Sequence, residues 1–171
     1  MERTIHILES INENVGRIFA WTTTLMVVVI CVDVILRYLF SFSFIWITEV
    51  EIYLFALSFL FGSGYALKHD KHVRVDLFYE GWSPVRKAWV NLLGSLFFLI
   101  PWCVVAIIAC WKYASFSFGF RESSPQAGGL PALYILKFCL MLGFVFLLMQ
   151  GIALILRSIL VIRGIEMNIE E

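Results

Sequence analysis

The stretch that decides the fold runs from residue 18 to residue 67 and reads IFAWTTTLMVVVICVDVILRYLF, then SFSF, then IWITEVEIYLFALSFLFGSGYAL. Two apolar runs, 18–40 and 45–67, are thus separated by only a very short connection. A helix that crosses about 30 Å of hydrocarbon needs about 20 mostly apolar residues, because each residue rises about 1.5 Å. The sequence therefore predicts two membrane-spanning helices joined as an antiparallel hairpin.

Two further runs, 88–113 and 131–156, have the same apolar character. The 171-residue chain is 61% hydrophobic and 15% charged, with a mean hydropathy of +0.87, which leaves too little polar surface for a soluble globule. The runs lack the alternation of barrel strands, and lipid does not tolerate unpaired backbone groups, so each is expected to be helical. We expect an all-α integral membrane protein, with residues 1–171 as one membrane domain of four transmembrane helices.

Two segments outside these spans have the pattern of interfacial helices. In segment 2–16, acidic residues and a histidine recur at helical spacing opposite an apolar arc, which predicts an amphipathic helix on the membrane surface. A second such helix is expected over 70–83, between the second and third spans, where aromatic residues including Phe78 and Trp82 fall on one arc, although VRVDL at 73–77 also alternates like a strand. Both segments are expected to rest at the interface rather than to cross the bilayer.

The basic residues predict the orientation of the chain. Three lie on the side of the short 41–44 connection, namely Arg37, Lys112 and Arg121. Nine lie on the other side, namely Arg3, Arg17, Lys68, Lys71, Arg74, Arg86, Lys87, Arg157 and Arg163. Because cytoplasmic segments are enriched in Lys and Arg, both termini are expected in the cytoplasm.

The stretch between the second and third spans is expected to act as a cytoplasmic arm on the lipid. Its cations would meet anionic lipid headgroups, and its aromatic side chains would dip into the interface. The residues assigned to this arm are Lys68, Lys71, His72, Arg74, Asp76, Phe78 and Trp82. The formal net charge of the whole chain is zero, so the sequence lacks the basic footprint of a nucleic-acid-binding protein.

Charged residues also occur within the spans, near the opposite side of the membrane. They are Asp33, Arg37, Glu49, Glu51 and Lys137. Charges at such depth are costly unless they are paired or hydrated, so they indicate either a polar lock or an ion path. The lock is favoured, since no second set of carboxylates continues toward the cytoplasm. Whether the lock lies within this chain or faces a partner is left open by the sequence.

Few residues offer catalytic or cofactor chemistry. The histidines His6, His69 and His72 lie outside the spans, which disfavours a haem site between facing helices. For the same reason the spans contain no histidine that could act as the general base for a serine or cysteine nucleophile. A His-x-x-His pair alone is weak evidence for zinc. We expect this chain to have no enzymatic activity and to bind no metal or cofactor. Small residues at Ser58, Gly62, Ala66 and Gly94 are predicted to allow close helix packing, within the chain or against a partner.

Several short motifs occur in a fixed order along the chain. They are Trp46 with Glu49 and Glu51, GSGYAL at 62–67, HVRVD at 72–76, Ser83-Pro84, and Leu130-Pro131 followed by Lys137. The order of these features resembles a known family, the small membrane subunit (DctQ-type, or Q subunit) of tripartite ATP-independent periplasmic (TRAP) transporters. Val50 separates two glutamates that are commonly adjacent in that family.

The resemblance implies a three-component secondary transporter in the bacterial inner membrane. In such systems a periplasmic protein binds the substrate, typically an organic acid, and a large polytopic subunit moves it with a sodium gradient. This chain would then be a non-catalytic, multi-pass subunit that stabilises the large subunit and helps dock the binding protein, without binding substrate or sodium. The alternative is a self-contained four-helix carrier of ions or solutes that uses the charged residues within the spans.

Overall fold

The computed structural model describes residues 2–69 and 81–164, and within them the regular elements are helices. The elements are α1 (Glu2–Leu39), α2 (Ile45–Lys68), α4 (Pro84–Gly94), the π-helical η1 (Ser95–Leu99), α5 (Ile100–Gly119) and α6 (Tyr134–Ile162). Three of these, α4, η1 and α5, form one continuous helix, so the described residues contain four helices that are long and apolar enough to cross a membrane. This confirms the all-α fold with four predicted spans.

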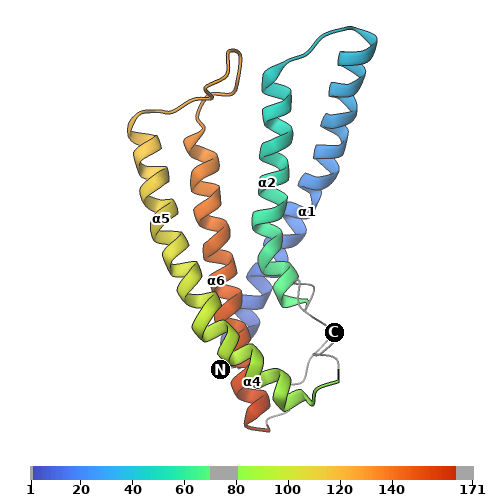
Figure 1. The fold of residues 1–171 in the computed structure, drawn as a ribbon. Helices are drawn as coiled ribbons and strands as arrows, with labels where there is room; N and C mark the ends of the chain where they lie inside the picture. Colours follow the sequence, from blue (N-terminus) through green and yellow to red (C-terminus); the bar gives the residue numbers. More distant parts are fainter. Residues whose placement is uncertain (1, 70–80, 165–171) are drawn as a thin grey trace.

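The four spans form two hairpins that lie side by side (Figure 1). One hairpin consists of α1 and α2, and the other of the α4–α5 helix and α6. Helix α6 packs against α1, α2, α4 and α5, and therefore connects the two hairpins. The N-terminus lies at the same end as α4 and the end of α6, whereas the connections α1–α2 and α5–α6 lie at the opposite end. We call these the terminal end and the loop end.

Segment 2–16 is continuous with the first span, because α1 is one helix from Glu2 to Leu39. This differs from the expected separate interfacial helix. Gly16 does not end the helix; it allows close contact with α2, since a Cβ there would lie 2.5 Å from the Tyr65 Cβ. The buried positions of this segment are Ile5, Asn12 and Gly16, while Ile18 is exposed. The side that packs inward thus includes the polar Asn12, which does not belong to the predicted apolar arc.

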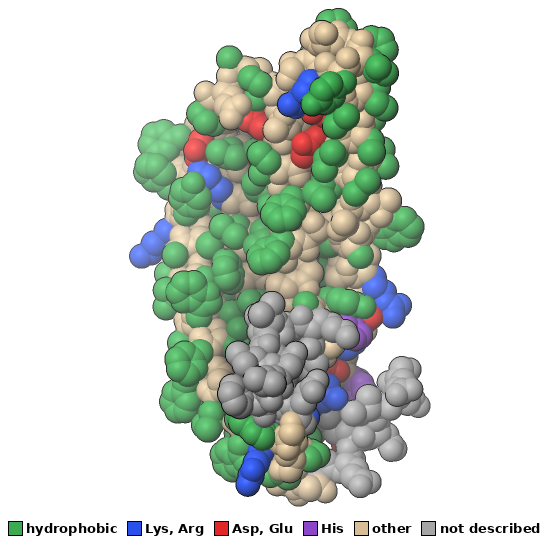
Figure 2. Space-filling model, turned by 45° about the vertical axis from the view of Figure 1, so that its right-hand side comes forward, with side chains coloured by type: hydrophobic (Ala, Val, Ile, Leu, Met, Phe, Trp, Pro, Cys, Tyr) green, Lys and Arg blue, Asp and Glu red, His purple; other side chains and the backbone are tan. Residues whose placement is uncertain are grey.

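Aromatic rings fill the contact between α1, α2 and α6. Phe19 and Phe61 stack with ring centroids 4.0 Å apart, and Phe61 meets Phe146 edge-on at 5.6 Å. Most other large apolar side chains are exposed, as expected where lipid surrounds a helix. On the face shown in Figure 2, hydrophobic side chains cover the middle of the molecule, and most charged side chains lie nearer the ends.

The third span changes its helix type next to a proline. Pro101 has no amide hydrogen, and its ring crowds the carbonyl of the preceding turn, which kinks helices. The structure places the π-helical turn Ser95–Leu99 just before Pro101, and the Ile100 amide donates to the Ser95 carbonyl. Figure 1 shows that α4 is inclined to α5 at this level, in agreement with the interruption expected from a proline within a span.

Close helix packing within the chain uses glycines other than the predicted ones. A Cβ at Gly62 or Gly94 would have no atom within 4 Å, whereas a Cβ at Gly143 would lie 2.9 Å from the Leu60 Cβ. Ser58 donates to carbonyls of its own helix, and Ala66 is half-buried. Packing of Ser58, Gly62, Ala66 and Gly94 against another protein stays a prediction.

Candidate functional site

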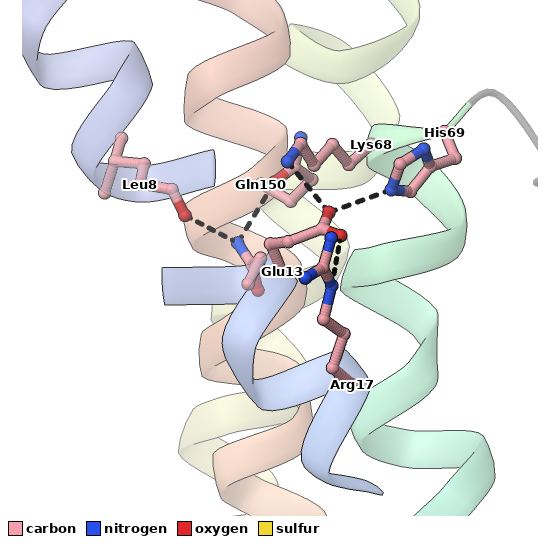
Figure 3. Close-up of polar contacts among 7 residues, drawn as sticks. Leu8, Glu13, Arg17, Lys68, His69 and Gln150 are labelled. Atoms are coloured by element: carbon pink, nitrogen blue, oxygen red, sulfur yellow. Dashed lines mark hydrogen bonds and ion pairs between the residues drawn. The ribbon is translucent and has the colours of Figure 1, made fainter. Parts of the chain in front are cut away.

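Polar side chains form one cluster at the terminal end, centred on Glu13 of α1 (Figure 3). Lys68 at the end of α2 donates to Glu13 Oε2 with an Nζ–O distance of 2.8 Å, and His69 Nε2 lies 2.9 Å from the same oxygen. Arg17 Nε donates to Glu13 Oε1 at 2.9 Å. We call these four residues the Glu13 cluster. Because its basic groups come from both helices, the carboxylate ties α1 to the end of α2.

A buried amide pair lies beside this cluster. Asn12 Nδ2 donates to Gln150 Oε1 of α6 at 3.1 Å and to the Leu8 carbonyl at 3.3 Å (Figure 3). Asn12 is 2% exposed and Gln150 is 3% exposed. A Cβ at Gly64 of α2 would lie 2.7 Å from Asn12 Oδ1, so the glycine leaves room for the amide. Since buried polar groups need partners, this pair fixes how α1, α2 and α6 meet.

At the loop end, Glu49 of α2 holds the connection between α5 and α6. Glu49 Oε2 accepts from the Leu130 amide at 2.5 Å, and Oε1 accepts from the Ser124 hydroxyl. The loop also closes on itself, because the Ser124 amide donates to the Leu130 carbonyl at 3.0 Å and the Leu133 amide donates to the Glu122 carbonyl at 2.9 Å. We call residues 120–133 the outer loop. Its bonds to Glu49 fasten it to the neighbouring hairpin.

The second contact of the outer loop is a charged pair with α6. Lys137 Nζ, whose residue is 7% exposed, donates to Glu122 Oε2 at 2.5 Å, and Ser117 Oγ donates to the same oxygen at 2.5 Å. The Lys137 ammonium also lies 3.9 Å from the centre of the Tyr113 ring. The hydrogen bond from Lys137, followed by that from Ser117, holds the pKa of Glu122 below its ordinary value.

The predicted charged residues within the spans lie in separate settings. Arg37 donates to Asp33 Oδ2 at 2.6 Å within α1, with side chains 49% and 6% exposed respectively. Glu49 and Lys137 bond to the outer loop instead. Among the described residues, Asp33 Oδ1 and Glu51 Oε1 are buried without a hydrogen-bond partner. The structure therefore shows a local pair on α1 and two contacts with the loop, rather than one five-residue cluster.

Most of the predicted cytoplasmic arm lies outside the residues that the structure describes. Lys68 belongs to the Glu13 cluster, and Trp82 lies just before α4. The remaining arm residues, Lys71, His72, Arg74, Asp76 and Phe78, lie outside the described residues. Within residues 2–69 and 81–164, no three His, Cys, Asp or Glu side chains are grouped so that they could hold a metal ion.

Several residues of the buried amide pair and of the contacts that hold the outer loop were not singled out as site residues from the sequence. Gln150 carried a usable signal, because an amide within an apolar span indicates a buried hydrogen bond between helices. Asn12 belonged to a segment expected at the membrane surface. Ser117 and Ser124 carried no signal, since polar residues are ordinary at a helix end and in a loop. Their role depends on how the outer loop folds back.

Comparisons with known proteins agree with the family resemblance noted in the sequence. Residues 26–161 match the family described as tripartite ATP-independent periplasmic transporters, DctQ component. The C4-dicarboxylate TRAP transporter small permease protein DctQ of Vibrio cholerae serotype O1 is 27% identical over 81 residues. That alignment covers 47% of this chain and 34% of the relative, so the chain matches about a third of the relative's length. No solved structure matches.

Proposed function

Because the chain belongs to the DctQ family of tripartite ATP-independent periplasmic transporters, we propose that it is the non-catalytic small membrane subunit of such a transporter and braces the complex. The observation that carries this proposal is the family match, which extends from within the first span to the end of the fourth. The chain is a multi-pass protein of the bacterial inner membrane. We propose that its termini lie in the cytoplasm, as the basic residues predict.

The use of the polar side chains supports a bracing role. The Glu13 cluster and the Asn12–Gln150 pair connect helices at the terminal end, and Glu49 and Lys137 fasten the outer loop. Between these ends, the contact of α1, α2 and α6 is made by the rings of Phe19, Phe61 and Phe146. These polar groups thus stabilise one arrangement of helices, and an apolar contact separates the two ends.

The outer loop is the part of this chain that we propose to contact the periplasmic substrate-binding protein. With the termini in the cytoplasm, the loop end faces the periplasm. The bonds from Glu49 and Lys137 support this role, because a loop already held in one conformation loses less entropy when a partner binds. The large polytopic membrane subunit would pack against the exposed apolar helix faces.

We propose that the large subunit carries out sodium-coupled import of an organic acid or a related solute. The name of the Vibrio cholerae relative refers to C4-dicarboxylates, which makes this class the first to test. In this proposal the chain described here binds neither the substrate nor sodium. We propose that it needs no cofactor of its own and that the sodium gradient acts on the partner subunit.

The test is reconstitution of the components in liposomes with a sodium gradient. We expect the chain to co-purify with a larger polytopic protein in about equal amount after mild solubilisation. We expect labelled dicarboxylate to accumulate only when the chain, the large subunit and the binding protein are all present. Accumulation by the chain alone would instead support the self-contained carrier, and absence of a larger partner would contradict the subunit role.

A further inference from the structure

A cavity of about 250 Å³ lies at the terminal end, lined by residues of α1, α2, α4 and α6. Its lining includes the cations Lys68, Lys87 and Arg157 and one carboxylate, Glu9. We infer that this basic pocket binds a phosphate-bearing anion, which is either the headgroup of an anionic phospholipid or free phosphate. The inference goes beyond the subunit role, because it assigns a ligand site to the small subunit itself.

The charges of the lining favour an anion. Lys68 is paired with Glu13, but Glu13 is shared with His69 and Arg17. Arg157 is half-buried and has no ion pair or hydrogen bond with the other described residues. A partly buried cation that makes no ion pair is costly, so a bound anion beside Arg157 would offset this cost.

The other lining groups match the chemistry of phosphate. Asn91, Gln150 and Ser158 bring side-chain amides and a hydroxyl to the same cavity, and these groups donate hydrogen bonds. Arginine binds phosphate through two parallel N–H bonds, and lysine binds it as a point charge. Pro84, the first residue of α4, also lines the pocket, and the partial positive charge of a helix N-terminus favours anions.

The position of the pocket suits a lipid headgroup. Lys87 directly precedes the apolar run 88–113, and Arg157 directly follows the run 131–156. These cations therefore lie where the hydrocarbon of the bilayer ends, on the side with more basic residues. The wall also includes apolar side chains such as Leu154 and Val161. Basic pockets between spans on the cytoplasmic side are known to bind anionic headgroups.

Native mass spectrometry of the full-length chain, in complex with its large subunit where that co-purifies, tests the inference. The probes are phosphatidylglycerol, phosphatidylcholine with the same acyl chains, and inorganic phosphate. We expect the wild type to retain phosphatidylglycerol in preference to phosphatidylcholine. Lys87→Gln/Arg157→Gln should reduce this retention about tenfold or more, since each basic residue near the surface contributes to anionic lipid binding.

The matched control is Arg86→Gln/Arg163→Gln, which removes the same number of charges from exposed positions outside the cavity lining. This control should retain phosphatidylglycerol as the wild type does. If inorganic phosphate binds and displaces the lipid, the pocket takes free phosphate as well; if only the lipid binds, the headgroup is its ligand. Either result supports a phosphate site.

Two outcomes would overturn the inference. One is equal retention of the two lipids by the wild type together with no binding of inorganic phosphate. The other is an equal loss of the lipid in the pocket variant and in the control variant. If the double pocket variant does not fold, judged by gel filtration and thermal unfolding, the wild-type comparison and Arg157→Gln alone still decide the question.

Discussion

Glu49 connects α2 to two groups of the outer loop, so its charge should determine how firmly the loop is held. We expect Glu49→Gln to weaken the hold on the loop, because the amide has one accepting oxygen where the carboxylate accepts at two. In addition, a hydrogen bond to a charged group contributes about 1.5–3 kcal/mol and a neutral one about 0.5–1.5 kcal/mol. Hydrogen exchange of the amides in the outer loop should become at least several-fold faster. Glu51→Gln is the matched control, since Glu51 lies on the same helix and its buried Oε1 has no partner among the described residues. Equal exchange in the two variants would contradict this role of Glu49.

Glu122 should make the stability of the outer loop depend on pH. Its pKa is lowered in the folded protein, mainly by the hydrogen bond from Lys137, so the stabilisation is present above the ordinary value of 4.5. As the pH falls below 4.5 and through the lowered pKa, protonation removes this stabilisation. Thermal unfolding in detergent should therefore show a loss of wild-type stability over this acidic range. Glu122→Gln should show a smaller loss, and the same loss in both proteins would exclude Glu122 as the cause.

The individual charges within the spans could be predicted from the sequence, but their partners could not. Glu49 and Lys137 were recognised because charges at that depth require compensation. Their partners lie in the outer loop, whose course depends on residues in left-handed backbone conformations: Arg121, Gly128 and Ala132. Of these, Gly128 is an ordinary choice, whereas Arg121 and Ala132 rarely adopt a positive φ. The sequence pattern therefore gave no means of tracing the loop back to Glu49.

At the scale of whole helices, the glycines determine how closely α1 and α2 approach. Gly16→Ala would place a Cβ 2.5 Å from the Tyr65 Cβ, so we expect a loss of about 1–3 kcal/mol, as for other overpacked contacts. Gly62→Ala is the matched control, because a Cβ there meets no atom within 4 Å. Since alanine favours helix by about 1 kcal/mol over glycine, Gly62→Ala should be neutral or stabilising. Thermal unfolding in detergent measures both, and equal shifts would mean that the contact at Gly16 is not restrictive.

The number and order of the helices could be predicted, but their lengths and inward faces could not. Hydropathy detects the lipid-embedded part of a helix, and the backbone bonds continue past it. The second span ends at Lys68 almost as predicted, whereas α6 continues to Ile162 and the first span begins at Glu2. The inward face of the first turns of α1 was not predicted, because Asn12 is compensated by Gln150, which is distant in the sequence. An apolar arc alone does not reveal such a partner.

At the scale of the whole molecule, α6 connects the two hairpins, and both polar ends involve it. Gln150 meets α1 at the terminal end, and Lys137 holds the outer loop at the other end. A helix packed against all its neighbours fixes the distance between the ends, because helices have little freedom to stretch. The basic pocket at the terminal end and the outer loop are thus held apart by one rigid element, as the proposed bracing role requires.

The uneven distribution of Lys and Arg between the two ends predicts which end faces the cytoplasm. Gly81 lies before α4 at the terminal end, and Ser123 lies in the outer loop, so the continuous helix 84–119 separates two exposed positions. We expect Ser123→Cys to react with a membrane-impermeant maleimide once the outer membrane is permeabilised. Gly81→Cys should react only after the inner membrane is broken, because the terminal end carries more Lys and Arg. The background replaces the native cysteines Cys31, Cys103, Cys110 and Cys139 with alanine.

Controls for this labelling follow from the packing. A Cβ at Gly81 meets no atom within 4 Å, so the cysteine there should leave the fold unchanged. Denatured samples should label equally at both positions, which shows that the reagent detects either cysteine. The reverse pattern would place the outer loop in the cytoplasm and so exclude it as the contact for a periplasmic protein. Labelling of both positions from the periplasm would contradict the single crossing between them.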